Sequence, residues 1–197
     1  MNIKKTANLL INFTIKRLAE IFGVIIFSGG VILFIALITY SPDDPNFIFP
    51  ENTKIKNLLG FQGSFVSDLF FQSIGLIAYL VSFTFIVTGI NIFRIKEFFS
   101  IIENIFFTII YCLFGTLFLT HFYSKGFTLY INGNGGFVGN YLNQTFFGSL
   151  IQINENIFYY ILILLVLFLF LISINFSPTN FYFYIKKILY LFLKNKE

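Results

Sequence analysis

Residues 21–42 read IFGVIIFSGGVILFIALITYSP, a stretch of 22 residues without a charged side chain. About 20 such residues in a helix cross the hydrocarbon core of a bilayer, where an ionised side chain costs about 2.5–3.5 kcal/mol. Three further uncharged windows are long enough to do the same: residues 69–93, 104–124 and 156–185. The uncharged stretch 126–154 contains six Gly and five Asn, so it is too polar to be a fifth span. The sequence therefore predicts an all-α membrane protein with four transmembrane helices.

The composition of the whole chain agrees with this prediction. Of the 197 residues, 57% are apolar and 11% are charged, whereas soluble domains carry about 25% charged residues. These charges are too few to cover the surface of a soluble enzyme or a nucleic-acid-binding domain, and disorder requires the opposite composition. The lone Cys112 and the lone His121 argue against a disulfide within the chain and against a thiolate or histidine metal site. We therefore expect no metal and no cofactor, and we expect the lipid bilayer as the first partner.

The basic residues predict the orientation of the spans, because positive charge accumulates on the cytoplasmic side. Ten of the 13 Lys and Arg residues lie before the first span, between spans two and three, or after the fourth. Both termini are therefore predicted to be cytoplasmic, with two outward loops at about 43–68 and 125–155. The chain divides into a basic N-terminal segment (1–17), a four-helix transmembrane domain (18–176) and a basic tail (177–197). In that tail, Ser177 and Pro178 are typical of a helix start, and residues 181–193 predict an interfacial C-terminal helix.

Small residues predict which spans pack closely, since hydrophobicity does not drive helices together in lipid. They are Gly23 and Gly30 in the first span, Gly75, Ala78, Ser82 and Gly89 in the second, and Thr108, Cys112 and Gly115 in the third. Residues 157–176 of the fourth span contain only Ser173 as a small residue. We expect spans one to three to form the tight core, and the fourth to face lipid or another subunit.

The sequence offers little that could perform catalysis. No Gly is followed by Lys, so the phosphate-binding motif of P-loop proteins does not occur in the sequence. The Gly-rich residues 133–139 match a dinucleotide-binding loop only in part, and we interpret them as a turn that leads into a short helix. The nine acidic residues lie at span ends or in loops. Glu20 is expected to pair with Arg17, and Asp68 to lie in the first turn or so of the second span.

Motifs in both outer loops resemble a known family. Directly after the first span, Ser41, Asp44 and Pro45 fit the S-x-x-D-P signature found in the N-terminal four-helix membrane domain of FtsK-type cell-division DNA translocases. The next residues are similar to that family's N-x-x-G-x-x-G loop and second span, in the same order: Asn57, Gly60, Gly63, Asp68, Phe71, Gly75, Ala78 and Tyr79. Gly135, Gly136 and Gly139, followed by Gly148, resemble the family's second outer loop. The similarity extends from about Leu18 to Ile174.

One departure from the family concerns the second span. A few residues after the Ala-Tyr pair the family often has Pro, where this chain has Ser82. The resemblance therefore does not carry a kink over to that position.

The resemblance implies a non-enzymatic anchor and assembly domain in the bacterial inner (plasma) membrane, with the division septum as its expected place. In such translocases a hexameric cytoplasmic motor pumps DNA during chromosome segregation. This chain ends at Glu197, so we expect no motor from it and no direct contact with nucleic acid. The expected partners are further copies of the chain and other division-site membrane proteins.

Two other classes of function stay open at this point. A small transporter or channel subunit would need polar groups along a path, and the spans offer only hydroxyls, Gln72, Asn91 and Cys112. A membrane enzyme would need a catalytic pair, which the sequence does not offer.

Overall fold

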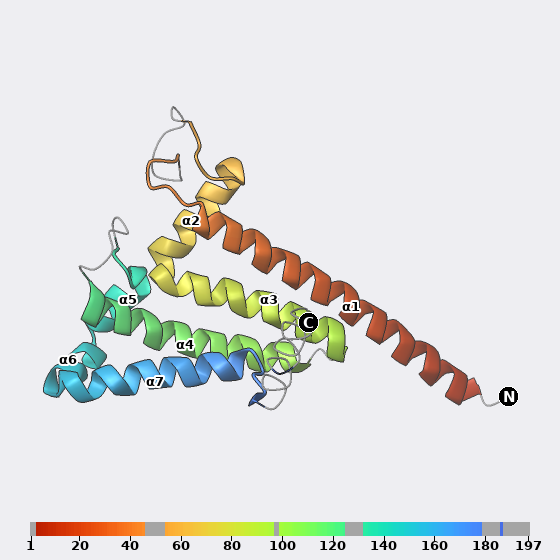
Figure 1. Cartoon of the computed structure of the whole chain (residues 1–197). Helices are drawn as coiled ribbons and strands as arrows, with labels where there is room; N and C mark the ends of the chain where they lie inside the picture. Colours follow the sequence, from red (N-terminus) through yellow and green to blue (C-terminus); the bar gives the residue numbers. More distant parts are fainter. Residues whose placement is uncertain (1–2, 46–53, 97–98, 125–131, 179–185, 187–197) are drawn as a thin grey trace, which may run out of the picture.

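The computed structural model describes residues 3–45, 54–96, 99–124, 132–178 and 186, and all regular structure in these ranges is helical (Figure 1). The helices are α1 (Ile3–Ile38), α2 (Gly60–Ile74), the 3₁₀ helix η1 (Gly75–Ile77), α3 (Ala78–Ile95), α4 (Phe99–Tyr123), α5 (Gly136–Asn143), α6 (Phe146–Ile153) and α7 (Glu155–Ser173). The interfacial helix predicted at residues 181–193 lies outside the described residues, apart from Lys186.

Four stretches of the described chain are long and apolar enough to cross a membrane. They are Asn8–Ile38, Gly60–Ile95, Ile101–Tyr123 and Glu155–Ser173. The prediction of four membrane-spanning helices is therefore confirmed. The direction in which they cross stays a prediction, and from it we name the two ends of the bundle outer and inner.

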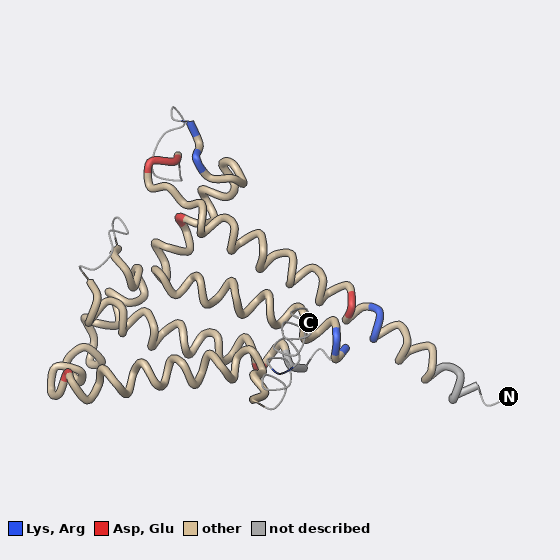
Figure 2. The backbone as a smooth tube through the Cα atoms, in the orientation of Figure 1, with Lys and Arg blue, Asp and Glu red and all other residues tan. Residues whose placement is uncertain are grey.

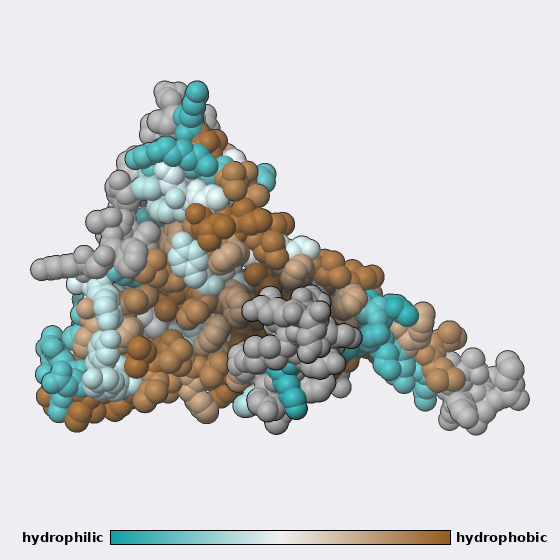
Figure 3. All heavy atoms as spheres, viewed as in Figure 1, coloured by the Kyte–Doolittle hydropathy of each residue, from teal (hydrophilic) through white to brown (hydrophobic). Residues whose placement is uncertain are grey.

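The four spans form two closely packed pairs, α1 with α3 and α4 with α7. Figure 1 shows α3, α4 and α7 side by side, with α1 inclined to all three. Hydrophobic residues cover most of the described bundle in Figure 3, and the hydrophilic residues gather mainly near the loops and along one part of α1. This distribution is the one expected of a protein whose solvent is lipid.

Glycines bring the backbones of α1 and α3 into contact. A Cβ atom at Gly23 would lie 2.8 Å from the Gly89 carbonyl oxygen, and one at Gly30 would lie 2.7 Å from the Ile86 amide nitrogen. Gly89 in turn lies against the backbone of Phe27. The structure thus places these three glycines where the two helices approach most closely.

The third span packs differently from the expectation that spans one to three form the core. α4 makes its most extensive contacts with α7, and far fewer with α3. A Cβ atom at Gly115 of α4 would lie 2.6 Å from the side chain of Ile77 and 3.7 Å from that of Val166 in α7. The small residue therefore accommodates bulky neighbours from two directions, which its sequence spacing does not reveal. The fourth span is the least buried of the four, as expected.

The second span is broken at Gly75. The backbone there has a φ of +58°, a conformation that Gly adopts readily and other residues do not. The chain then makes the single 3₁₀ turn η1 before α3 begins, and α3 continues without interruption through Ser82. Because α2 already begins at Gly60, Asp68 lies in its third turn and is buried, so the prediction that Asp68 lies in a first turn is wrong.

Two neighbouring glycines of α1 test the contact with α3. Replacing Gly30 with Ala adds a methyl group against the Ile86 backbone, and we expect a loss of about 1–3 kcal/mol of stability. A Cβ at Gly29 would meet no atom of the described residues within 4 Å, so Gly29→Ala should leave stability unchanged or raise it slightly. Thermal denaturation of the detergent-solubilised protein would measure both. An equal melting temperature for the two variants would contradict the interface.

Candidate functional site

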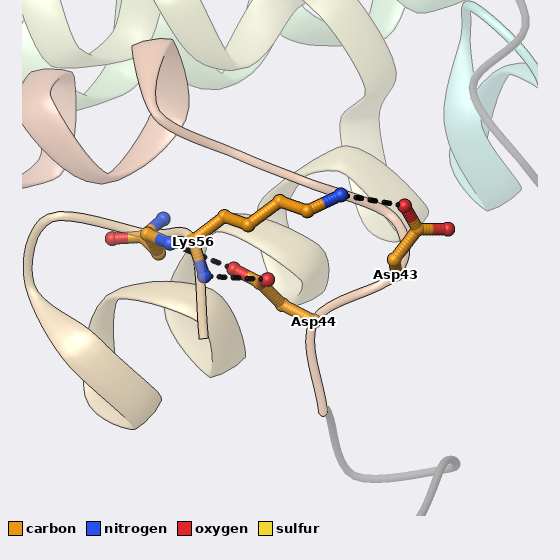
Figure 4. A network of polar contacts seen from close by, with 4 residues as sticks. Asp43, Asp44 and Lys56 are labelled. Atoms are coloured by element: carbon orange, nitrogen blue, oxygen red, sulfur yellow. Dashed lines mark hydrogen bonds and ion pairs between the residues drawn. The ribbon is translucent and has the colours of Figure 1, made fainter. Parts of the chain in front are cut away.

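The motif residues that the sequence analysis identified lie mostly in the two outer loops. In the first outer loop, between α1 and α2, the carboxylate of Asp44 holds the chain together (Figure 4). This side chain is buried, with 1% of its surface exposed. Its two oxygens accept hydrogen bonds from the backbone N–H groups of Lys56 and Asn57, both at 2.8 Å. Bonds to an ionised acceptor are among the stronger hydrogen bonds in proteins. Asp44 thus ties the chain after α1 to the chain before α2.

A second carboxylate of this loop lies at the surface. The Lys56 ammonium donates to Asp43 at 2.8 Å, and this bond raises the pKa of Lys56. Both side chains are more than half exposed, and exposed ion pairs contribute about 0–1 kcal/mol. The adjacent acids Asp43 and Asp44 therefore differ in setting, since the Asp44 carboxylate is buried against two backbone N–H groups, whereas the Asp43 carboxylate pairs with Lys56 at the surface.

Asn57 joins the same loop to the outer end of α1. Its side-chain amide donates to the Ala36 carbonyl at 2.9 Å, and its side-chain oxygen accepts from the Leu59 N–H at 3.0 Å. The Gly60 N–H donates to the Asn57 carbonyl at 3.0 Å, and any side chain at Gly63 would collide with the Asn57 amide. The N-x-x-G-x-x-G spacing is thus explained by one turn, in which the side chain of Asn57 occupies the space that a side chain at Gly63 would need.

The remaining motif residues of the first loop hold α2 against α1. Ser41 accepts a turn hydrogen bond from the Asp44 N–H at 3.1 Å. The Pro45 carbonyl accepts from the Ser64 hydroxyl at 3.0 Å, and Asp68 accepts from the Tyr40 hydroxyl at 3.1 Å. The first of these contacts closes a turn within the loop that follows α1. The other two join that segment to α2.

The second outer loop docks on the break in the second span. The Asn134 carbonyl accepts a hydrogen bond from the Leu76 N–H at 2.9 Å, and Gly75 lies directly against Asn134. Asn132 donates to the backbone and side-chain oxygens of Gln72 at 3.2 and 3.1 Å. The loop therefore supplies a partner to a backbone group of the interrupted helix.

The three motif glycines of this loop are positions of close approach. Gly135 and Gly139 both lie against Thr116 and Thr120 of α4, and Gly136 lies against the backbone of Ser73. The Gly-rich segment leads directly into α5, which begins at Gly136. The structure places it as a packed junction between the second and third spans, where sequence reasoning suggested only a turn.

At the outer end of α4, His121 lies between two partners. Its Nδ1 atom is 2.8 Å from Asn143 of α5, and its Nε2 atom is 3.8 Å from the carboxylate of Glu155. Within the described ranges, no group of three or more His, Cys, Asp and Glu side chains is placed to hold a metal ion. His121 thus links α4 to α5 and to the start of α7.

Charged residues of the described chain gather near the ends of the bundle (Figure 2). At the inner end, Glu20 pairs with Arg17 at 2.5 Å, as expected from their spacing, and also with Lys96 at 2.5 Å. The contact with Lys96 joins α1 to the residue that ends α3. It could not be found from the sequence, because the two residues are far apart along the chain.

A set of amides at the inner end was also missed by sequence reasoning. Asn104 donates to the Thr88 hydroxyl at 3.1 Å and accepts from Asn175 at 2.9 Å, while Asn91 donates to the Ile174 carbonyl at 3.1 Å. These bonds join α3, α4 and the end of α7. The signal was present, since an Asn in an apolar helix requires a partner, but the sequence alone does not identify the partner.

Comparison with known proteins bears on the origin of these motifs. The family described as the 4TM region of DNA translocase FtsK/SpoIIIE matches residues 15–183. The DNA translocase FtsK of Rickettsia typhi is 36% identical over 62 residues, which are 32% of this chain and 8% of that protein. The chain thus aligns with only a small part of that relative. No solved structure matches the chain.

The two acids of the first loop provide a test of its architecture. In Asp44→Asn an amide N–H₂ faces one of the two backbone donors, so at least one bond to a buried group is lost, at about 1–3 kcal/mol. Asp43→Asn removes an exposed ion pair and should change stability by at most about 1 kcal/mol. The melting temperature in detergent should therefore fall clearly for Asp44→Asn only. A similar fall for both variants would contradict the assignment.

A pair of glycines tests the docking of the second loop. Gly133 and Gly136 have φ values of +66° and +67°, so replacement by Ala strains both backbones alike. Among the described residues, a Cβ at Gly133 would meet the Ser124 carbonyl at 3.9 Å, whereas one at Gly136 would lie 2.6 Å from the Ser73 backbone. We expect Gly136→Ala to be the less stable variant and to open the loop to added protease. The prediction fails if protease cuts both variants at the same rate.

Proposed function

Because the chain belongs to the family of the 4TM region of the DNA translocases FtsK and SpoIIIE, we propose that it is a non-enzymatic membrane anchor and assembly domain. It acts in the inner membrane at the division septum, for a translocase that serves cell division and chromosome segregation. In this proposal the chain itself binds no DNA, and it supplies position and attachment for the activity of the translocase.

The observation that carries this proposal is the use of the motif residues. In the outer loops, Asp44, Asn57 and Asp68 bond to other groups of this chain, and the glycines admit neighbouring backbone. The motifs therefore build a folded outer surface on top of four spans. A fixed surface of this kind is what recognition by other membrane proteins requires.

Exposed aromatic and aliphatic side chains on α5 and α6 give that surface its character. Phe137 and Tyr141 stack on each other with ring centroids 6.4 Å apart, and Phe146 and Ile153 are also exposed. Aromatic side chains are enriched both at membrane interfaces and in protein contacts. We propose that further copies of the chain and other division-site membrane proteins are the partners of this domain.

The alternative of a transporter or channel subunit has less support from the geometry. The polar side chains of the inner end are bonded to one another and to the backbone, and Thr84 shares a hydrogen bond with Tyr111 at 2.9 Å. A permeation path needs polar groups that are available to the transported species. These side chains instead connect α3 to α4 and to the end of α7.

The location of the protein in dividing cells tests the proposal. A fluorescent protein fused to the C-terminus of the full chain should concentrate at mid-cell, because an assembly domain follows its division-site partners. An unrelated four-span protein with the same tag should label the membrane evenly. If the outer surface directs assembly, Gly136→Ala should reduce the mid-cell signal more than Gly133→Ala does. Even labelling by the unaltered chain would overturn the proposal.

A further inference from the structure

The first part of α1 is apolar and exposed on several sides. Every residue from 8 to 18, a segment that we name the α1 arm, is exposed, whereas the next residue, Ala19, is fully buried. Successive residues of a helix point about 100° apart, so Leu9, Leu10 and Ile11 face three different directions. The large apolar side chains of the α1 arm each have 45% or more of their surface exposed: Leu9, Leu10, Ile11, Phe13, Ile15 and Leu18.

This distribution indicates what surrounds the α1 arm. A helix with apolar residues on every side is typical of a protein core or a membrane. Figure 1 shows the α1 arm extending past the other spans, so the described bundle does not enclose it. A single partner helix would cover one side and leave the others in water. Membrane lipid contacts all sides of a helix at once, and it therefore fits the α1 arm best.

The length of α1 brings the arm within reach of lipid. The apolar stretch Asn8–Ile38 has 31 residues, or about 46 Å of helix, whereas the hydrocarbon core of a bilayer is about 30 Å thick. A stretch longer than the core is accommodated by tilting. Figure 1 shows α1 inclined to α3, α4 and α7. The inclination directs the α1 arm along the inner leaflet as well as away from the outer end.

The polar groups of the α1 arm are compatible with a leaflet boundary. The Thr14 hydroxyl donates to the Leu10 carbonyl at 3.0 Å, so this polar group has its partner within the helix. The Arg17 guanidinium lies 5.1 Å from the centre of the Phe13 ring and pairs with Glu20 at 2.5 Å. Long basic side chains hold their charge at the headgroups while their methylene groups stay in apolar surroundings. Lys16 and Arg17, the only charged residues of the arm, therefore suit this boundary.

The charge of the N-terminal segment indicates the class of lipid. Its first 19 residues contain Lys4, Lys5, Lys16 and Arg17 and no acidic residue. Residues 6–15 between these two basic pairs are uncharged. A Lys or Arg close to an anionic membrane surface favours binding by about fivefold. Two basic pairs at the ends of an apolar stretch are thus complementary to a leaflet that contains anionic phospholipid.

We propose that the α1 arm lies in the inner leaflet, with its apolar side chains among the acyl chains and with Lys16 and Arg17 at the phosphate groups of anionic phospholipids. The membrane contact of α1 then continues beyond the point where Glu20 pairs with Lys96. This inference goes beyond the proposed assembly function and does not depend on it.

Quenching of a fluorescent dye by nitroxide-labelled acyl chains tests the location. In the full chain, Cys112 is replaced by Ala, and the dye is attached to single cysteines introduced as Leu9→Cys, Leu10→Cys and Ile11→Cys. Each protein is reconstituted in vesicles of phosphatidylcholine and phosphatidylglycerol. We expect quenching at all three positions, because lipid surrounds the α1 arm.

Two further positions calibrate the measurement. Phe168→Cys places the dye on the exposed side of the fourth span, where lipid is the neighbour, and Lys54→Cys places it in the exposed outer loop. Quenching in the α1 arm should approach that at the Phe168 position and exceed that at the Lys54 position. Quenching on one side of the arm only would indicate a protein neighbour on the other sides and would overturn the proposal, as would the absence of quenching.

The position of the nitroxide tests the preference for anionic lipid. With the label on phosphatidylglycerol, quenching in the α1 arm should be stronger than with the same amount of label on phosphatidylcholine, whereas the Phe168 position should show no such difference. Lys16→Gln should lower this ratio in the arm by up to about fivefold. Lys54→Gln, which removes one exposed charge from the outer loop, should leave the ratio unchanged. Equal quenching by the two labelled lipids, or a ratio that Lys16→Gln does not alter, would contradict the binding of anionic phospholipid.

Discussion

Hydrocarbon cannot satisfy the hydrogen-bonding groups of a peptide, and the architecture of this protein follows from that constraint. Within a regular helix the backbone satisfies itself, so the difficulty lies where helices end or break. At those places the loops provide the partners. Asn57 bonds to the Ala36 carbonyl near the end of α1, and Asn134 bonds to the Leu76 N–H at the break between α2 and α3. The outer loops are thus structural parts of the membrane domain.

The same constraint explains why short loop motifs and glycines occur together in this chain. A loop can reach a backbone group of a helix only if no side chain stands between them, and Gly75, Gly135 and Gly136 provide that access. Along the spans, Gly23, Gly30 and Gly89 serve a different purpose, since they permit two complete helices to touch. In lipid this contact gains stability from packing, because removal from water contributes nothing there.

The sequence was sufficient for features that depend on composition and local spacing. The four spans, the ion pair of Glu20 with Arg17 and the low burial of the fourth span all follow from residues close together in the chain. The pairing of α4 with α7, the break at Gly75 and the contact of Glu20 with Lys96 do not. They depend on which distant segment fills a given space. The outer-loop motifs lie between these two groups. Their residues could be recognised in the sequence, but the hydrogen bonds that these residues make could not be predicted from it.

The long first helix shows how one element can meet two requirements at once. Its glycine face must be smooth to admit α3, whereas its opposite face carries bulky residues over more length than the membrane needs. Glu20 and its partners Arg17 and Lys96 lie beside this length of helix, and apolar side chains do not end there. They continue to Leu9 and Leu10, both exposed. α1 is therefore apolar over a greater length than the helix α3 against which its glycine face packs.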